Sequence, residues 1–98
     1  MAQMLTLAAH AADPDRFYLI DVRDADDYAA AHVAGAVHIP LADLGKRASE
    51  LPAGKTPVTI CGKGGGRSAD GAGILNTLGH PDALWLEGGT TGWLAQNT

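Results

Sequence analysis

The chain has 98 residues, of which 46% are hydrophobic and 18% are charged, as in an ordinary soluble globular protein. This length predicts one domain, residues 1–98, with a single core of marginal stability. The net charge of −4 and the lack of any basic run argue against nucleic acid or an anionic membrane as the partner. No apolar run approaches the roughly 18 residues that a membrane span needs.

The single cysteine and the amino terminus bear on the cellular location. One cysteine cannot form an internal disulfide, so we expect the chain in a reducing compartment such as the cytoplasm. The first residues contain no basic segment, and His10 interrupts their apolar part. We therefore interpret the amino terminus as mature protein and not as a signal peptide.

The first half of the chain predicts two helices and two strands. Residues 4–12 are rich in Ala and Leu and predict a short helix, which the turn signal Asp13-Pro14 ends. Residues 17–21, FYLID, form a short apolar run that predicts a buried strand. Residues 24–31 predict a short helix with acidic side chains in its first turn, where the helix dipole favours them. Residues 36–40, AVHIP, predict a brief strand that the proline stops.

The second half continues the same alternation. Residues 41–51 have a helical pattern that the glycine within it weakens. Residues 56–60, TPVTI, predict a second buried strand, and residues 67–79 predict a helix with a glycine at its carboxyl-terminal end. Residues 83–89 predict a last strand that runs into a glycine turn, and residues 90–97 a final short helix. Strands that alternate with helices indicate an α/β fold with a mainly parallel sheet.

The stretch CGKGGGRS, residues 61–68, carries the strongest chemical signal. Cys61 falls at the carboxyl end of a predicted central strand, on the turn that opens a helix, where open α/β sheets bind ligands. Glycines allow a loop to aim successive N–H groups at one atom, and the helix adds the positive end of its dipole. A thiol in such a cradle should have a lowered pKa. Because Lys63 and Arg67 add two cations, the stretch predicts a nucleophile in an anion-binding pocket.

A lone cysteine also has a plainer interpretation, because cysteine is among the residues most often buried as small hydrophobes. Gly-rich turns likewise serve as plain connectors or as phosphate loops, although no Gly-Lys-Ser/Thr follows here at the spacing of a Walker loop. The strand-to-helix position, the glycines and the flanking cations together favour a reactive thiol.

Three blocks of the chain resemble the single-domain rhodaneses, which are sulfurtransferases. LIDVRDADDYAAAHVAGAVHIP, residues 19–40, is similar to the first signature of that family, with Asp27 where the family usually has Glu and Ala31 where it usually has Gly. VTICGKGGGRSA, residues 58–69, resembles the active-site strand and loop. WLEGGTTGW, residues 85–93, resembles the carboxyl-terminal signature of Gly-Gly and Trp.

This resemblance implies a rhodanese-like α/β fold, with a doubly wound, mainly parallel sheet flanked by helices. It implies Cys61 as the catalytic nucleophile, with Asp21 and His32 as structural support. Substrate binding falls to three basic residues, the loop glycines and one hydroxyl, namely Lys63, Arg67, Arg23, Gly62, Gly64, Gly65, Gly66 and Ser68. Neither a metal nor an organic cofactor is implied.

The activity that the resemblance implies moves a sulfane sulfur in two steps. The Cys61 thiolate attacks the outer sulfur of thiosulfate or a similar donor, sulfite leaves, and the loop N–H groups stabilise the resulting persulfide. A thiophilic acceptor, such as cyanide, a cellular thiol or a protein sulfur acceptor, then takes the sulfur. Lys63 would attract the anionic donor, while Arg67 would either point into the pocket or pair with an acid at the base of the loop.

The length of the loop keeps a second chemistry open. Most single-domain rhodaneses have an Arg five residues after the Cys, whereas Arg67 lies six residues after Cys61. That longer spacing resembles Cdc25-like phosphatases and arsenate reductases, whose loops surround a tetrahedral anion. Ile60 stands where such phosphatases usually have His, and no general acid is obvious near the loop, so sulfur transfer is favoured. A sulfur carrier or regulatory rhodanese module without fast turnover would have the same sequence features.

The remaining polar and aromatic candidates have structural interpretations. His32 and His38 lie six residues apart, but no ligand set at metal-site spacing completes them, and His32 is expected to make structural hydrogen bonds. Asp21 either orients Arg23 or the loop, or caps a helix. Glu87 could shape the rim of the pocket, and Trp85 and Trp93 are expected to pack in the core or as a lid.

Overall fold

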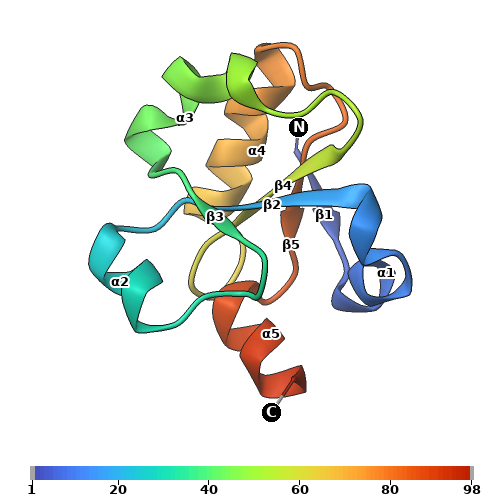
Figure 1. Cartoon of the computed structure of the whole chain (residues 1–98), viewed down its shortest axis with the longest axis vertical. Coiled ribbons are helices and arrows are strands. Elements are labelled where there is room, and N and C mark those ends of the chain that lie inside the picture. Colours follow the sequence, from blue (N-terminus) through green and yellow to red (C-terminus); the bar gives the residue numbers. More distant parts are fainter. Residues whose placement is uncertain (1, 98) are drawn as a thin grey trace.

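The structure is a computed structural model that describes residues 2–97. Its five strands form one parallel sheet in the order β1-β5-β4-β2-β3. The strands are β1 Gln3–Leu5, β2 Phe17–Asp21, β3 Val37–His38, β4 Thr56–Ile60 and β5 Leu84–Leu86. The α-helices are α1 Leu7–Ala12, α2 Ala25–Ala30, α3 Leu41–Arg47, α4 Arg67–Thr77 and α5 Gly89–Gln96, with 3₁₀ helices at Pro14–Arg16 and Ala48–Glu50 (Figure 1).

The alternation expected from the sequence is confirmed from β2 onward. The two apolar runs form β2 and β4, which pair in parallel along their whole length at the centre of the sheet. The helix expected over residues 67–79 is α4, and Gly79 follows it with a φ of 97°, the left-handed backbone that suits glycine after a helix. The helix expected over residues 41–51 ends earlier, because its last turn tightens into a 3₁₀ helix.

The prediction of one helix over residues 4–12 is wrong at its start. Gln3–Leu5 form the edge strand β1, which pairs with β5, and the helix begins only at Leu7. The Thr6 side chain accepts a hydrogen bond from the Ala9 N–H at 3.0 Å and so caps the helix. Pairing with a distant strand therefore outweighed the helical preference of a short Ala- and Leu-rich run.

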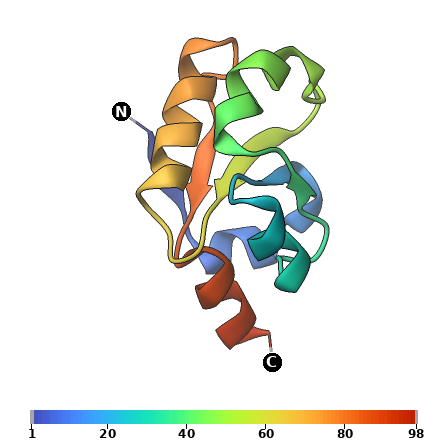
Figure 2. The same ribbon diagram turned by 90° about the vertical axis from the view of Figure 1, so that its left-hand side faces the viewer.

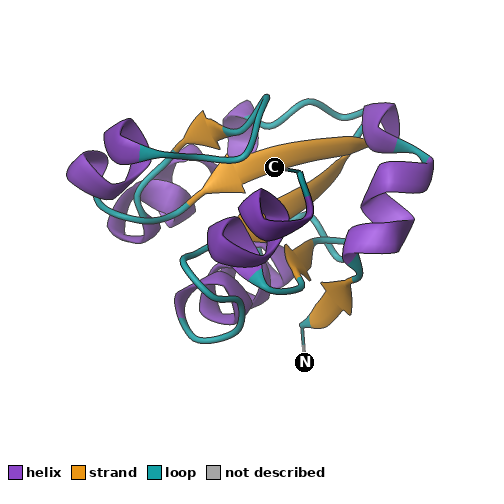
Figure 3. Ribbon diagram, turned by 90° about the horizontal axis from the view of Figure 1, so that it is seen from below, coloured by secondary structure: helices purple, strands orange, loops and turns teal. Residues whose placement is uncertain are grey.

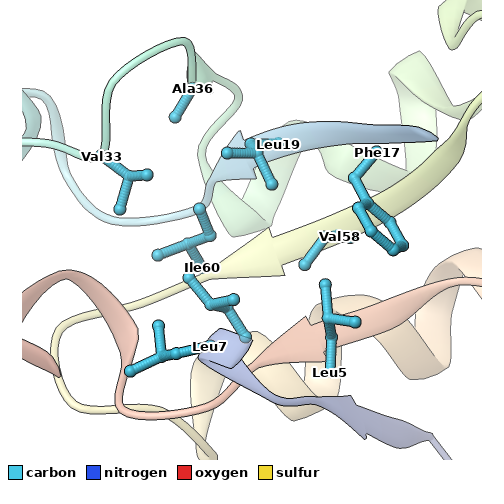
Figure 4. Close-up of a cluster of buried hydrophobic side chains, with 9 residues drawn as sticks. Leu5, Leu7, Phe17, Leu19, Val33, Ala36, Val58 and Ile60 are labelled. Carbon is cyan, nitrogen blue, oxygen red and sulfur yellow. The ribbon is translucent and has the colours of Figure 1, made fainter. Parts of the chain in front are cut away.

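Helices cover both faces of the sheet, as the doubly wound arrangement requires. In Figure 1, α3 and α4 lie above the sheet and α5 lies below it; Figure 3 looks from the α5 side and shows this helix in front of the strands. Because side chains alternate along a strand, β2 and β4 send apolar residues to both faces. The lower cluster (Figure 4) comprises Leu5, Leu7, Phe17, Leu19, Val33, Ala36, Val58, Ile60 and Leu86, with Trp93 packed against it. The upper cluster includes Ile20, Val22, Leu44, Leu75 and Cys61.

Gly71 lets α4 pack closely on β4 and α3. A Cβ at this position would lie 3.2 Å from methyl groups of both Leu44 and Thr59, which is tighter than ordinary contact. Gly73 lies in the same helix, yet a Cβ there would have no neighbour within 4 Å. Close packing therefore requires glycine at position 71 and does not require it at position 73.

We expect opposite effects from alanine at these two positions. Gly73→Ala should raise the free energy of unfolding by about 0.5–1 kcal/mol, because alanine loses less backbone entropy in a helix. Gly71→Ala should lower it by about 1–2 kcal/mol, because overpacking exceeds that gain. Urea unfolding of both variants beside the parent chain measures the difference, and equal stabilisation by both changes would contradict the packing argument.

Candidate active site

Cys61 follows the last residue of β4, at the edge of the sheet where the carboxyl ends of the parallel strands meet. The residue is only 6% exposed, and its thiol is free. Asp21, the last residue of β2, pairs in register with Ile60, and the Val22 N–H donates to the Ile60 carbonyl at 3.0 Å. The segment that follows β2 therefore runs beside the segment that carries Cys61.

The loop between Cys61 and α4 turns through three consecutive glycines in the left-handed region. Their φ angles are 86° at Gly64, 74° at Gly65 and 46° at Gly66. A residue with a Cβ adopts such angles only with strain, and three in succession are practical only for glycine. The loop can therefore curl back toward Cys61 before α4 begins at Arg67.

The sulfur of Cys61 lies in a small ring of polar atoms. Cys61 Sγ is 3.2 Å from Ser68 Oγ and 3.1 Å from the carbonyl oxygen of Gly65, and the Ser68 hydroxyl donates to that same carbonyl at 2.9 Å. Ser68 has no exposed surface. In the thiol form the S–H group therefore has two neighbouring acceptors, and the Ser68 hydroxyl can donate to sulfur once the proton leaves.

The environment lowers the pKa of the Cys61 thiol. Burial alone would raise that pKa, because it disfavours the thiolate. Hydrogen bonds from the Ser68 side chain and from the main-chain N–H groups of Ser68, Gly64 and Lys63 together outweigh burial. The first turn of α4 adds the positive end of a helix dipole on the same side. The site thus favours a nucleophilic thiolate.

The loop differs in one respect from the cradle expected from the sequence. The N–H groups of Lys63 and Gly64 face the sulfur, but at Gly65 the carbonyl faces it instead. Gly66 accepts a hydrogen bond from the Asp70 N–H within the start of α4, and the Gly62 carbonyl points away toward α5. The sulfur is therefore surrounded by N–H donors from Lys63 and Gly64, by the donors of Ser68, and by one carbonyl, that of Gly65.

The two cations of the loop, Lys63 and Arg67, are exposed. Neither forms an ion pair with any residue from 2 to 97, so the structure does not pair Arg67 with an acid at the base of the loop. Their part in binding an anion beside Cys61 stays a prediction.

Arg23 and Asp21 form a buried ion pair beside the loop. Asp21 has no exposed surface and accepts hydrogen bonds from the Arg23 main-chain N–H, Nε and Nη2, the last at 2.8 Å. Arg23 also donates to the carbonyl of Ala31. The hydrogen bond to Asp21 is the main cause of the raised pKa of Arg23. Asp21 therefore orients Arg23 and caps no helix, while a substrate contact by Arg23 stays a prediction.

His32 makes structural contacts, as we expected. Its Nδ1 lies 2.8 Å from the Tyr28 carbonyl, so it donates there, and its ring stacks on the Tyr28 ring at 3.9 Å. His38 stacks against the Tyr28 ring as well, and its Nε2 donates to the carbonyl of Arg23 at 2.7 Å. Within the part of the chain that the structure describes, no three residues of His, Cys, Asp or Glu gather as metal ligands.

The turn Gly88–Gly89 supports the loop in a way that the sequence did not reveal. A Cβ on Gly89 would lie 2.6 Å from the Cys61 carbonyl oxygen, and a Cβ on Gly64 would lie 2.8 Å from the Gly88 nitrogen. The two backbones therefore touch directly. The doubled glycine at the start of α5 was the only signal in the sequence, and it does not indicate which segment the turn touches.

Comparison with known proteins agrees with this geometry. The family model for the rhodanese-like domain matches residues 3–96. The chain belongs to the rhodanese-like domain family. It is 39% identical over 80 residues to a probable adenylyltransferase/sulfurtransferase, MoeZ, of Mycobacterium tuberculosis, covering 80% of this chain but only 20% of that protein. It is 34% identical over 77 residues to the thiosulfate sulfurtransferase GlpE of Pseudomonas fluorescens, covering 76% of this chain and 68% of that protein.

The rhodanese-like fold is also clear from solved structures. The human single-domain sulfurtransferase TSTD1 superposes with a TM-score of 0.86 at 23% identity, covering the whole of both chains. At that identity the similarity establishes the fold alone. In the described part of this rhodanese-like chain, no helix is long and apolar enough to cross a membrane.

Two further residues of the rhodanese-like signatures have structural contacts. Glu87 Oε1 accepts a hydrogen bond from the Leu7 N–H at 3.0 Å, so this side chain joins the end of β5 to the start of α1. Trp93 packs against the lower core cluster and so holds α5 to the sheet, as expected for core packing.

Alanine substitutions distinguish the glycines of this rhodanese-like site. Gly64→Ala and Gly89→Ala should each lower the free energy of unfolding by about 2 kcal/mol or more, because both combine positive φ with contact to backbone. Gly62→Ala is the control, since a Cβ there has no neighbour within 4 Å and its φ is not positive. Urea unfolding checks this, and a Gly62 variant as unstable as the other two would refute it.

The pH dependence of Cys61 alkylation tests the pKa. The midpoint should lie below that of an ordinary thiol, and Ser68→Ala should raise it because one donor to the thiolate is lost. Because the folded pKa is lower than the unfolded one, the free energy of unfolding should rise with pH between the two values. Cys61→Ala should remove that rise. An alkylation midpoint equal to that of an ordinary thiol would contradict the lowered pKa of Cys61. The same pH dependence of unfolding free energy in the parent chain and in Cys61→Ala would also contradict it.

Proposed function

We propose that this chain is a sulfurtransferase that carries a sulfane sulfur as a persulfide on Cys61. The observation that carries the proposal is the contact between the Cys61 sulfur and Ser68 Oγ at 3.2 Å, in a loop whose hydrogen-bond donors lower the pKa of the thiol. The same donors that favour a thiolate would stabilise the negative outer sulfur of a persulfide. The relatives named as sulfurtransferases support the same chemistry.

Thiosulfate or a similar anionic donor fits the charges at the loop. The Cys61 thiolate attacks the outer sulfur, a new S–S bond forms, and the old one breaks with its electron pair leaving on sulfite. A thiophilic acceptor, such as cyanide or a thiol, then attacks the outer sulfur and the Cys61 thiolate is restored. The unpaired cations Lys63 and Arg67 would attract the dianion. No proton donor is required for sulfite to leave.

Phosphate or arsenate chemistry is the second candidate, and one observation favours it: Arg67 lies six residues after Cys61. Three features weigh against it. Arg67 makes no hydrogen bond to the loop, the Gly65 carbonyl faces the sulfur, and no carboxylic acid among the described residues hydrogen-bonds to the loop. An inward carbonyl offers no hydrogen bond to a phosphoryl oxygen, and ester hydrolysis needs a general acid. Sulfur transfer is therefore the better fit.

We further propose that residues 1–98 act as one rhodanese-like unit in a reducing compartment such as the cytoplasm, where a free thiol persists. The chain spans only a fifth of MoeZ, so the unit could act alone or as part of a longer protein. A sulfur carrier, whose acceptor is a protein, would form the same persulfide as a sulfurtransferase enzyme and would differ from it only in lacking fast turnover.

Mass spectrometry after incubation with thiosulfate tests the proposal. We expect the chain to gain the mass of one sulfur atom, and Cys61→Ala to gain none. Cyanide should then remove the sulfur with repeated turnover. In parallel, the release of phosphate from a small aryl phosphate is measured.

Each alternative has its own outcome. Formation of a persulfide without turnover on cyanide would indicate that the chain is a sulfur carrier and not an enzyme. No gain of sulfur, together with Cys61-dependent phosphate release, would overturn sulfur transfer in favour of phosphatase chemistry.

A further inference from the structure

The amino-terminal end of α5 lies against the loop that carries Cys61. The main-chain N–H of Thr90 donates to the Cys61 carbonyl at 2.9 Å, and that of Thr91 donates to the Gly62 carbonyl at 2.9 Å. Figure 2 shows the loop that follows β4, in yellow, meeting the start of α5, in red. The first N–H groups of a helix have no acceptor within the helix, so α5 can give these two to the loop.

These two hydrogen bonds decide which way the loop peptides face. In a planar trans peptide the C=O and N–H bonds point in opposite directions. When the Gly62 carbonyl points to α5, the N–H of the same peptide group, which belongs to Lys63, must point away from α5. That N–H is one of the groups that hydrogen-bond to the Cys61 sulfur. The contact with α5 therefore turns a donor toward the nucleophile.

The contact is close and protected. Gly89 and Gly64 allow the two backbones to touch without a side chain between them, and Thr90 is only 3% exposed. Trp93, on the same helix, packs against the lower core cluster and holds α5 in place. At Gly65 and Gly66, in contrast, a Cβ would meet nothing within 4 Å. Only the first half of the loop is held in this way.

We propose that the amino-terminal turn of α5 is a positioning element for Cys61, in which the main-chain N–H of Thr91 holds the Gly62–Lys63 peptide with its N–H toward the sulfur. Thr91 acts through the backbone alone and touches neither the sulfur nor a donor molecule. Its effect on sulfur transfer rests on the function proposed above, whereas its effect on the thiolate does not.

Thr91→Pro tests the proposal because it removes this N–H donor at an exposed position. Proline is tolerated in the first turn of a helix, where its missing N–H breaks no intrahelical bond. Thr91→Ala is the matched control, since it removes the same side chain and keeps the N–H. If Thr91→Pro does not fold, replacing Thr91 by the corresponding α-hydroxy acid through semisynthesis removes the N–H with no ring.

The measured quantity is the rate of Cys61 alkylation by iodoacetamide as a function of pH. The midpoint should rise by about one pH unit in Thr91→Pro relative to Thr91→Ala, and in the ester relative to the parent chain, which is a tenfold loss of thiolate below both midpoints. The limiting rate at high pH should be kept or should increase, because a more basic thiolate is a stronger nucleophile. A general loss of structure would not give this pattern.

Equal midpoints in the folded proline chain and in Thr91→Ala, or in the ester and the parent chain, would overturn the proposal. Alkylation needs no sulfur donor, so this result does not depend on the proposed function. A parent chain that takes no sulfur from thiosulfate would refute sulfur transfer, while a raised midpoint in Thr91→Pro would still support the positioning role.

Discussion

The reactive site depends on a direct contact between two stretches of backbone, Cys61–Gly64 and Gly88–Gly89. The Ser68 hydroxyl and three main-chain N–H groups stabilise the thiolate, and a peptide group stabilises a negative charge only when its N–H end faces that charge. The contact supplies that orientation, because α5 binds the carbonyl ends of the loop. Other parts of the fold position this contact. The glycine turn directly follows β5, and Trp93 packs α5 against the core.

The surroundings of Cys61 combine opposing electrostatic effects. Burial opposes the thiolate, whereas the N–H groups and the Ser68 hydroxyl favour it and prevail. The carbonyl of Gly65 accepts from the thiol and would be unfavourable beside a full negative charge. The Ser68 hydroxyl lies within hydrogen-bonding distance of both that carbonyl and the sulfur. It can therefore donate to the carbonyl while Cys61 is a thiol, and to the sulfur once Cys61 is a thiolate. The inward carbonyl of Gly65 therefore favours the thiol form, and the surrounding hydrogen-bond donors favour the thiolate.

Much of the fold was predictable because local patterns agree with the tertiary arrangement. The runs FYLID and TPVTI are apolar on both faces, as central parallel strands must be, and they form β2 and β4. Residues 3–5 were missed because three residues carry too little periodicity to indicate a strand, and β1 exists only through its pairing with β5. For Asp21 the sequence left open whether it orients Arg23, orients the loop or caps a helix, and the structure pairs it with Arg23.

The sequence by itself determined the order of the elements from β2 onward, the single cysteine and the glycine-rich loop, because these follow from residue type and near-neighbour spacing. Only the tertiary structure decided which loop atoms face the sulfur. The Gly65 carbonyl turns inward, the Lys63 and Gly64 N–H groups do likewise, and the Cys61 and Gly62 carbonyls turn to α5. Glycine permits every one of these orientations at similar cost, so the choice falls to contacts with Thr90 and Thr91, which are distant in the chain.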